Sequence, residues 1–175
     1  MSMKALFAGT VGLALIASPA SAQQAPAVEI APYAGYMLFG DFIEGPLGTF
    51  YLREESDRPM IFVAGGTGFA PIKAMLEHAF HHEVDRPMVL YWGARSLADL
   101  YMPQLPASWQ QAHSNFTFIP VLSEPKVEDA WPGRTGFVHQ AVLDDFAELS
   151  GYQVYACGAP AMIDAARTTF TGTRA

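Results

Sequence analysis

Short apolar runs alternate with stretches of helical periodicity along most of this chain, and this alternation restricts it to few folds. The apolar runs have the length and the predominantly apolar composition of strands that are buried on both faces of a parallel sheet. They span residues 60–64, 88–92, 116–122 and 153–156, and the clearer helices span residues 70–84, 138–149 and 160–170. Strands that alternate with helices predict an α/β fold, in which helices cover both faces of a parallel sheet as three layers.

A glycine-rich turn follows the first predicted strand and opens the first predicted helix. Residues 65–68 read Gly-Gly-Thr-Gly, and Pro71 stands in the first turn of the helix. Glycines let backbone amides approach a pyrophosphate, and the helix dipole favours its negative charge. The turn differs from the Walker motif, because no Gly-Lys-Ser/Thr follows, and from Gly-x-Gly-x-x-Gly, because a proline replaces the third glycine. It predicts a phosphate-bearing ligand, and an ordinary tight turn is the alternative.

Two further motifs end the second and fourth predicted strands. Gly-Ala-Arg-Ser closes the second strand at residues 93–96, and Cys-Gly-Ala-Pro-Ala-Met closes the fourth at residues 157–162. Parallel strands present their carboxyl ends on one rim of the sheet, and ligands of such sheets bind beyond that rim. We therefore expect the three motifs to lie together.

In this order the motifs resemble the NAD(P)-binding domain of the ferredoxin-NADP reductase-like flavoenzymes, and the resemblance covers residues 45–171. Segments 121–125, 131–136 and 138–146 are most similar to the CDP-6-deoxy-3,4-glucoseen reductase branch and to oxygenase reductase components. The resemblance implies an oxidoreductase, or a fragment of one, that passes electrons from NAD(P)H through FAD to an iron-sulfur centre or another acceptor. This chain would supply the NAD(P)H-binding domain.

The resemblance also implies roles for single residues. The glycine turn would cradle the pyrophosphate and the nicotinamide side of the nucleotide, and Arg95 with Ser96 would meet the adenosine ribose or its 2′-phosphate. Cys157 and Thr67 would be the catalytic residues near the nicotinamide, although a free cysteine is commonly just a small buried apolar side chain. No acidic residue directly ends the second strand, so NADH and NADPH both remain open. The implied nucleotide-binding residues are Gly65, Gly66, Thr67, Gly68, Pro71, Arg95, Ser96, Cys157, Gly158, Pro160 and Met162.

Members of this family carry a flavin-binding barrel before the NAD(P)-binding domain. Residues 45–58 resemble only the end of that barrel and a linker, and the Arg-x-Tyr-Ser flavin motif is missing. We also expect a sheet truncated at its C-terminal strand, because the sequence stops before the aromatic strand of the family. Cys157 is the single cysteine, which excludes a four-thiolate iron-sulfur cluster within this chain. A flavin domain or an iron-sulfur acceptor protein is therefore the expected partner, supplied in trans or in a longer relative.

The first 44 residues have a different character. Residues 1–22 have the layout of a cleavable secretory signal, with Lys4, an apolar run and Ala-Ser-Ala before Gln23. The run is shorter than the roughly 20 residues of a membrane-spanning helix, so we expect none. Residues 23–44 form an irregular or short-strand segment that resembles the start of outer-membrane barrel proteins, and residues 59–175 form the NAD(P)-binding domain. A second hypothesis is therefore an exported envelope protein, periplasmic rather than cytoplasmic, whose reductase-like part binds nucleotide without catalysis or is a fusion remnant.

Other candidate sites have simpler explanations. The net charge of -7 argues against nucleic acid as a partner. His78 and His82 share a helical face but lack the glutamate of His-Glu-x-x-His, so we expect a solvated helix end and no metal. Asp144 and Asp145 are adjacent and point in different directions on a helix, which excludes a paired acid and base.

Overall fold

The computed structural model describes residues 35–38, 42–43 and 50–172, all of which belong to one compact unit, Ala31–Ala175. The predicted signal segment and the domain boundary near Glu44 lie outside the described residues. The strands are β1 (Gly35–Leu38), β2 (Phe42–Ile43), β3 (Met60–Gly65), β4 (Met88–Ala94), β5 (Phe116–Leu122), β6 (Arg134–Thr135) and β7 (Gln153–Cys157). The helices are α1 (Phe69–His81), α2 (Gln104–Ala112), α3 (Val138–Asp145) and α4 (Pro160–Gly172), with 3-10 turns η1 (Gly66–Gly68), η2 (Leu97–Asp99) and η3 (Val127–Asp129).

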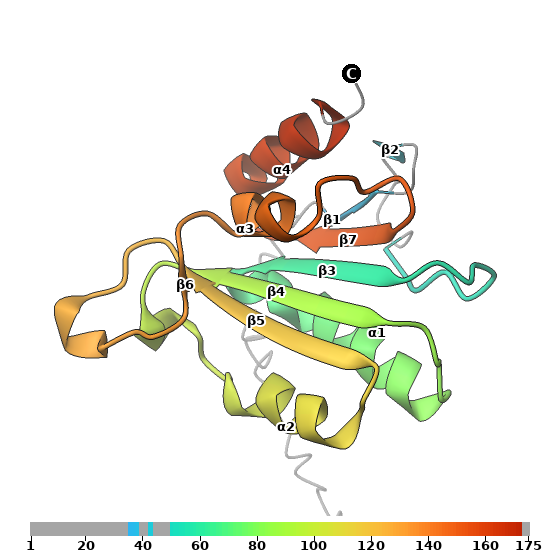
Figure 1. The fold of residues 1–175 in the computed structure, drawn as a ribbon, viewed down its shortest axis with the longest axis horizontal. Coiled ribbons are helices and arrows are strands. Elements are labelled where there is room, and N and C mark those ends of the chain that lie inside the picture. Colours follow the sequence, from blue (N-terminus) through green and yellow to red (C-terminus); the bar gives the residue numbers. More distant parts are fainter. Residues whose placement is uncertain (1–34, 39–41, 44–49, 173–175) are drawn as a thin grey trace, which may run out of the picture. The chain divides into compact units, whose positions relative to one another are not determined.

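One sheet with the strand order β2-β1-β7-β3-β4-β5-β6 forms the centre of this unit (Figure 1). Strands β7, β3, β4, β5 and β6 are parallel, which confirms the predicted α/β class and its parallel sheet. Strand β1 runs antiparallel to β7, and β2 runs antiparallel to β1. Two short strands from the segment predicted to be irregular or short-stranded therefore extend the sheet along the outer edge of β7.

The predicted elements are present, and their ends differ for local reasons. Helix α1 stops at His81 rather than at residue 84, since Glu83 has a φ of 52°, in the left-handed region that ends helices. Helix α3 stops at Asp145 rather than at residue 149, because Phe146 has an extended backbone. Strand β4 continues to Ala94, two residues beyond its apolar run. Strand β6 is too short to leave a periodic signal in the sequence.

Alternate residues of the central strands point to opposite faces of the sheet and fill two hydrophobic clusters. Phe62 and Trp92 pack on one face with α1 and α2, and Val63 and Tyr91 pack on the other with α3 and α4. Each helix turns one apolar face to the sheet, and the result is the predicted three-layer arrangement. None of the helices among residues 50–172 is both long and apolar enough to cross a membrane.

Candidate nucleotide-binding rim

The three sequence motifs meet at the carboxyl ends of β3, β4 and β7. The register pairs Gly65 of β3 with Gly93 of β4, and Ala64 of β3 with Cys157 of β7. Each motif therefore begins at the same level of the sheet, on neighbouring strands. The prediction that they share one rim is confirmed, because parallel pairing places equivalent strand ends side by side.

The glycine turn between β3 and α1 needs glycine for its backbone conformation. Gly66 has a φ of 51°, in the left-handed region, and a Cβ added there would meet no atom within 4 Å. Residues 66–68 form the 3-10 turn η1, and the Phe69 amide that follows donates to the Gly66 carbonyl. The Thr67 side chain is exposed at the tip. The turn thus presents backbone and a hydroxyl to solvent at the N-terminal end of a helix, where the dipole is positive.

Gly68 brings this turn into backbone contact with the end of β7. A Cβ on Gly68 would lie 2.1 Å from the carbonyl oxygen of Cys157 and 2.7 Å from the amide nitrogen of Gly158. Neither atom belongs to a side chain that could turn aside. Only glycine allows the two loops to approach this closely, so the contact sets their spacing.

Met162 in the first turn of α4 lies against both loops. A Cβ on Gly65 would lie 2.4 Å from the Met162 sulfur, and a Cβ on Gly158 would lie 2.8 Å from its terminal methyl carbon. Pro160, exposed at the rim, is the first residue of α4 and so has the position at which proline starts a helix. Pro71 takes a similar place early in α1. These three predicted residues shape the two loops from the helical side.

Cys157 is almost completely buried at the end of β7, with 1% of its surface exposed. Burial raises the pKa of the thiol from 9.0 to about 11. The side chain is therefore a neutral thiol at neutral pH and a poor nucleophile, because nucleophilic attack needs the thiolate. This environment fits the small apolar side chain that the sequence left open as the alternative.

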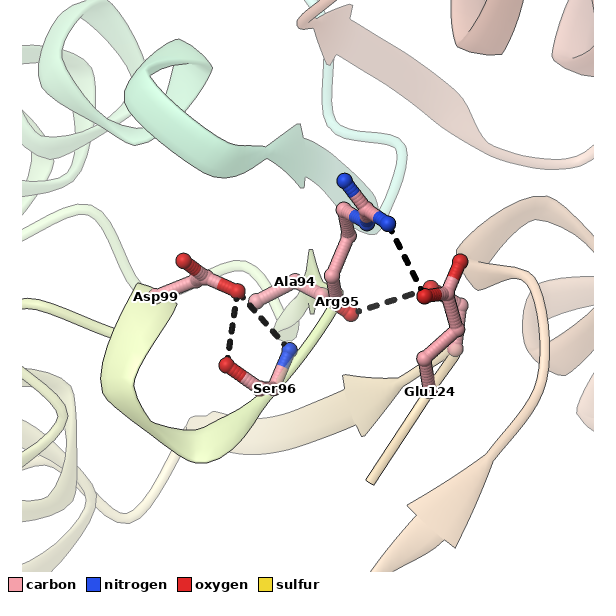
Figure 2. A network of polar contacts seen from close by, with 6 residues as sticks. Ala94, Arg95, Ser96, Asp99 and Glu124 are labelled. Carbon is pink, nitrogen blue, oxygen red and sulfur yellow. Dashed lines mark hydrogen bonds and ion pairs between the residues drawn. The ribbon is translucent and has the colours of Figure 1, made fainter. Parts of the chain in front are cut away.

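Arg95 lies just beyond β4 and faces an acidic residue from the neighbouring strand end (Figure 2). Its guanidinium Nη2 donates to Glu124 Oε2 at 3.0 Å, and the Glu124 amide donates to the Arg95 carbonyl at 2.8 Å. The hydrogen bond to Glu124 raises the pKa of Arg95. The backbone bond continues the β4–β5 ladder past Leu122, so it holds the carboxylate beside the guanidinium.

Ser96 is engaged by a second carboxylate (Figure 2). Its amide and its hydroxyl donate to Asp99 Oδ2 at 2.9 and 2.8 Å, which is the capping arrangement of η2. The backbone hydrogen bond from Ser96 lowers the pKa of Asp99. No acidic residue directly ends the strand, and the sequence did not predict Glu124 as the partner of Arg95 or Asp99 as the partner of Ser96. Only the strand register could have placed Glu124 next to Arg95.

The remaining candidates are occupied by structural contacts. His78 Nε2 lies 2.7 Å from Glu54 Oε1, and the His78 ring lies against that of His82 on the exposed end of α1. Among the residues that the structure describes, no group of three or more potential ligands is placed to hold a metal ion. Asp145 accepts hydrogen bonds from Tyr91 and Arg134, while Asp144 accepts from Gln140. The two carboxylates diverge, as expected.

Comparison with known proteins agrees with this geometry. The family model of the oxidoreductase NAD-binding domain matches residues 62–168. The chain is 52% identical over 128 residues to protein RfbI of Salmonella typhimurium. It is 46% identical over 128 residues to the CDP-6-deoxy-L-threo-D-glycero-4-hexulose-3-dehydrase reductase of Yersinia pestis. Each match covers 73% of this chain and 38% of the relative, so the chain spans well under half the length of these proteins.

Solved structures show the same similarity. The Amycolatopsis cytochrome P450 reductase GcoB superimposes with a TM-score of 0.66 at 36% identity, over 77% of this chain and 41% of that one. The ferredoxin reductase in carbazole 1,9a-dioxygenase superimposes with a TM-score of 0.61 at 28% identity, over 76% and 39% of the two chains. Both proteins are reductases by name, and both are longer than this chain.

Proposed function

This chain belongs to the oxidoreductase NAD-binding domain family, and on that premise we propose that it binds NAD(P)H for an electron-transferring reductase. The reductase would pass a hydride to FAD and then electrons to an iron-sulfur centre or another acceptor. One observation carries the proposal: the glycine turn and the Cys157-Gly158 loop lie in backbone contact on one rim. The relatives point the same way, since they include an NAD(P)H-flavin reductase of Aliivibrio fischeri at 40% identity.

Different residues of the rim suit the pyrophosphate, the adenosine ribose and the nicotinamide of the nucleotide. The open space above Gly66 and the positive end of α1 suit the pyrophosphate, because backbone can approach it and the dipole favours its charge. Arg95 and Ser96 follow the neighbouring strand β4, at the place proposed for the adenosine ribose. NAD(P)H, when bound, supplies a hydride from its nicotinamide ring. The protein contributes the orientation of the ring and the exclusion of water from it.

We place the nicotinamide beside Cys157 and Thr67. The neutral, buried thiol adds no charge to the ring's surroundings, and the exposed Thr67 hydroxyl is free to rotate toward either a donor or an acceptor. Both residues therefore serve to position the ring, and Cys157 forms no covalent bond in the reaction. Pro71, Pro160, Gly158 and Met162 complete the loops that flank the ring.

Residues 45–58 resemble only the end of the family's flavin-binding barrel, so we assign FAD binding to a partner or to a longer protein. The names of other relatives fit such a partnership, for example the reductase component DmpP of phenol 2-monooxygenase from Pseudomonas. An iron-sulfur or oxygenase acceptor is the proposed partner of this chain. An activity that consumes NAD(P)H also favours the cytoplasm over the periplasm, because exported proteins meet little of this cofactor. An exported protein would instead begin at Gln23. The mass of the purified chain distinguishes this cleaved form from the full-length form.

The rim favours NADH over NADPH. Arg95 lies at the proposed ribose site, and it is already paired with Glu124. A 2′-phosphate would have to displace that carboxylate or lie beside it, and both cost free energy. Asp99 accepts both hydrogen bonds that Ser96 donates, so the Ser96 hydroxyl is engaged as well.

Titration of the purified chain with NADH, by calorimetry and by absorbance with and without added FAD, tests the proposal. We expect saturable binding, and Gly66→Ala should weaken it because alanine strains a φ of 51° in the turn itself. Gly136→Ala is the matched control, since Gly136 also has a positive φ of 109° and open space around it, outside the turn. Absence of binding at millimolar NADH and NADPH would refute the proposed function.

A further inference from the structure

A buried tryptophan lies directly beneath the glycine turn. Trp92 of β4 has no exposed surface, and its ring stacks on Phe69 with centroids 4.0 Å apart and 18° between the planes. Its indole Nε1 donates to the backbone carbonyl of Gly66 at 3.0 Å. A core side chain of one strand thus reaches the loop that follows the neighbouring strand and bonds to its backbone.

The Gly66 carbonyl is held on the inner side of the turn by two donors. One is the Trp92 indole, and the other is the amide of Phe69. A carbonyl oxygen has two lone pairs, so this group is fully satisfied from within the protein. Its direction is therefore set by groups that themselves belong to a strand and to the start of a helix.

The direction of this carbonyl determines where the next amide points. In a trans peptide the C=O and N–H groups lie in the peptide plane and point in opposite directions, so the Thr67 N–H points away from Trp92. Thr67 is exposed at the tip of the turn, whereas Trp92 is in the core. The Thr67 amide is consequently directed outward over the rim.

We propose that Trp92 is a positioning residue for nucleotide binding: it holds the Gly66 carbonyl inward and so aims the Thr67 amide at a pyrophosphate oxygen. This inference rests on the proposed function and adds a residue that does not itself touch the ligand. Gly66 is the element that would otherwise rotate, because glycine has the widest choice of backbone conformations and nothing lies within 4 Å of its missing Cβ. Preorganised amides bind anions without the cost of reorienting at the moment of binding.

A substitution at position 92 can remove the N–H donor of the indole while keeping an aromatic ring. Phenylalanine at position 92 would keep an aromatic ring to stack on Phe69 but would lose the N–H donor. The Gly66 carbonyl would then keep one donor of two, and the peptide that ends in the Thr67 amide would be less restrained. A role in packing alone predicts lower stability with unchanged affinity, while a positioning role predicts weaker binding of the diphosphate.

The test is Trp92→Phe, with Trp131→Phe as the matched control. Trp131 also donates its indole N–H to a backbone carbonyl, that of Arg134 at 2.8 Å, so the control loses the same kind of bond away from the turn. The dissociation constants of NADH and of ADP are measured by calorimetry for both variants. We expect Trp92→Phe to weaken both ligands about tenfold, the effect of one lost hydrogen bond, and Trp131→Phe to change them less than about twofold.

Backbone amide NMR spectra supply a readout that packing alone would not move. On addition of ADP the Thr67 amide proton should shift downfield in the wild-type chain and shift less in Trp92→Phe. Equal affinities with an unchanged Thr67 shift would overturn the inference while leaving the proposed function intact. Absence of nucleotide binding by the wild-type chain would instead refute the proposed function. If Trp92→Phe fails to fold, the wild-type spectra still decide, since a Thr67 amide that ignores bound ADP contradicts the inference.

Discussion

Replacement of Gly68 by alanine should be the most damaging single-methyl change at the rim. The added Cβ would lie 2.1 Å from the Cys157 carbonyl oxygen and 2.4 Å from its carbon, where ordinary contacts begin at 3.4 Å. The start of α1 would have to move away from β7 by more than an ångström. Both sides of the contact are backbone, and Cys157 is paired with Ala64 in the central sheet, so no side-chain rotation relieves the clash.

The expected cost follows from the overpacking of protein cores. Extra methylenes in a packed interior cost about 1–3 kcal/mol, and the upper end applies here because backbone must shift. A loss of about 3 kcal/mol lowers the melting temperature of a domain of this size by roughly 10 °C. Nucleotide affinity should fall as well, since the same shift separates the glycine turn from the Cys157-Gly158 loop.

Thermal unfolding followed by circular dichroism measures the effect, and Gly151→Ala is the control. A Cβ on Gly151 would meet nothing within 4 Å, and its φ lies outside the left-handed region, so this variant should stay within about 0.5 kcal/mol of wild type. If Gly68→Ala unfolds within a degree or two of Gly151→Ala and binds NADH as wild type does, the argument that this close contact sets the loop spacing is wrong.

Three further predictions concern charge, thiol reactivity and pH. Glu124→Gln should lower the preference for NADH over NADPH about fivefold, the effect of one charge at roughly 4 Å in water, as it frees Arg95 for a 2′-phosphate. Glu128→Gln, in η3 and without a hydrogen bond to Arg95, should leave the calorimetric affinity ratio unchanged; an equal change in both variants would contradict this role. The Cys157 thiol should resist Ellman's reagent at pH 8 in the folded chain and react on unfolding. Burial raises the pKa of this thiol from 9.0 to about 11, so the folded chain binds the proton more tightly than the unfolded chain. The thiol's contribution to stability is therefore lost as pH rises through that range. Urea titrations of wild type and Cys157→Ala at pH 8 and 10.5 check that the free energy of unfolding falls with pH more in wild type.

The central elements could be predicted because their signals are local. The run Phe116–Leu122 is apolar except for Thr117 and is a strand with those bounds, and the predicted strands 60–64 and 153–156 each end one residue before the observed strand does. Helix ends were less predictable, as at Glu83, where a left-handed backbone stops α1 without any glycine to signal it. The pairing of β1 with β7 was also beyond prediction, since it joins segments far apart in the chain.

For the candidate site, sequence alone determined which loops form it. The glycine turn, the Arg95-Ser96 pair and the Cys157-Gly158 loop each follow an apolar strand, and parallel pairing makes such strand ends neighbours. The tertiary structure alone decided what these residues do to one another. The bond from Trp92 to Gly66 and the pairing of Arg95 with Glu124 cross between strands. Their partners depend on register and on the direction of each side chain, and neither quantity is encoded in any short stretch of sequence.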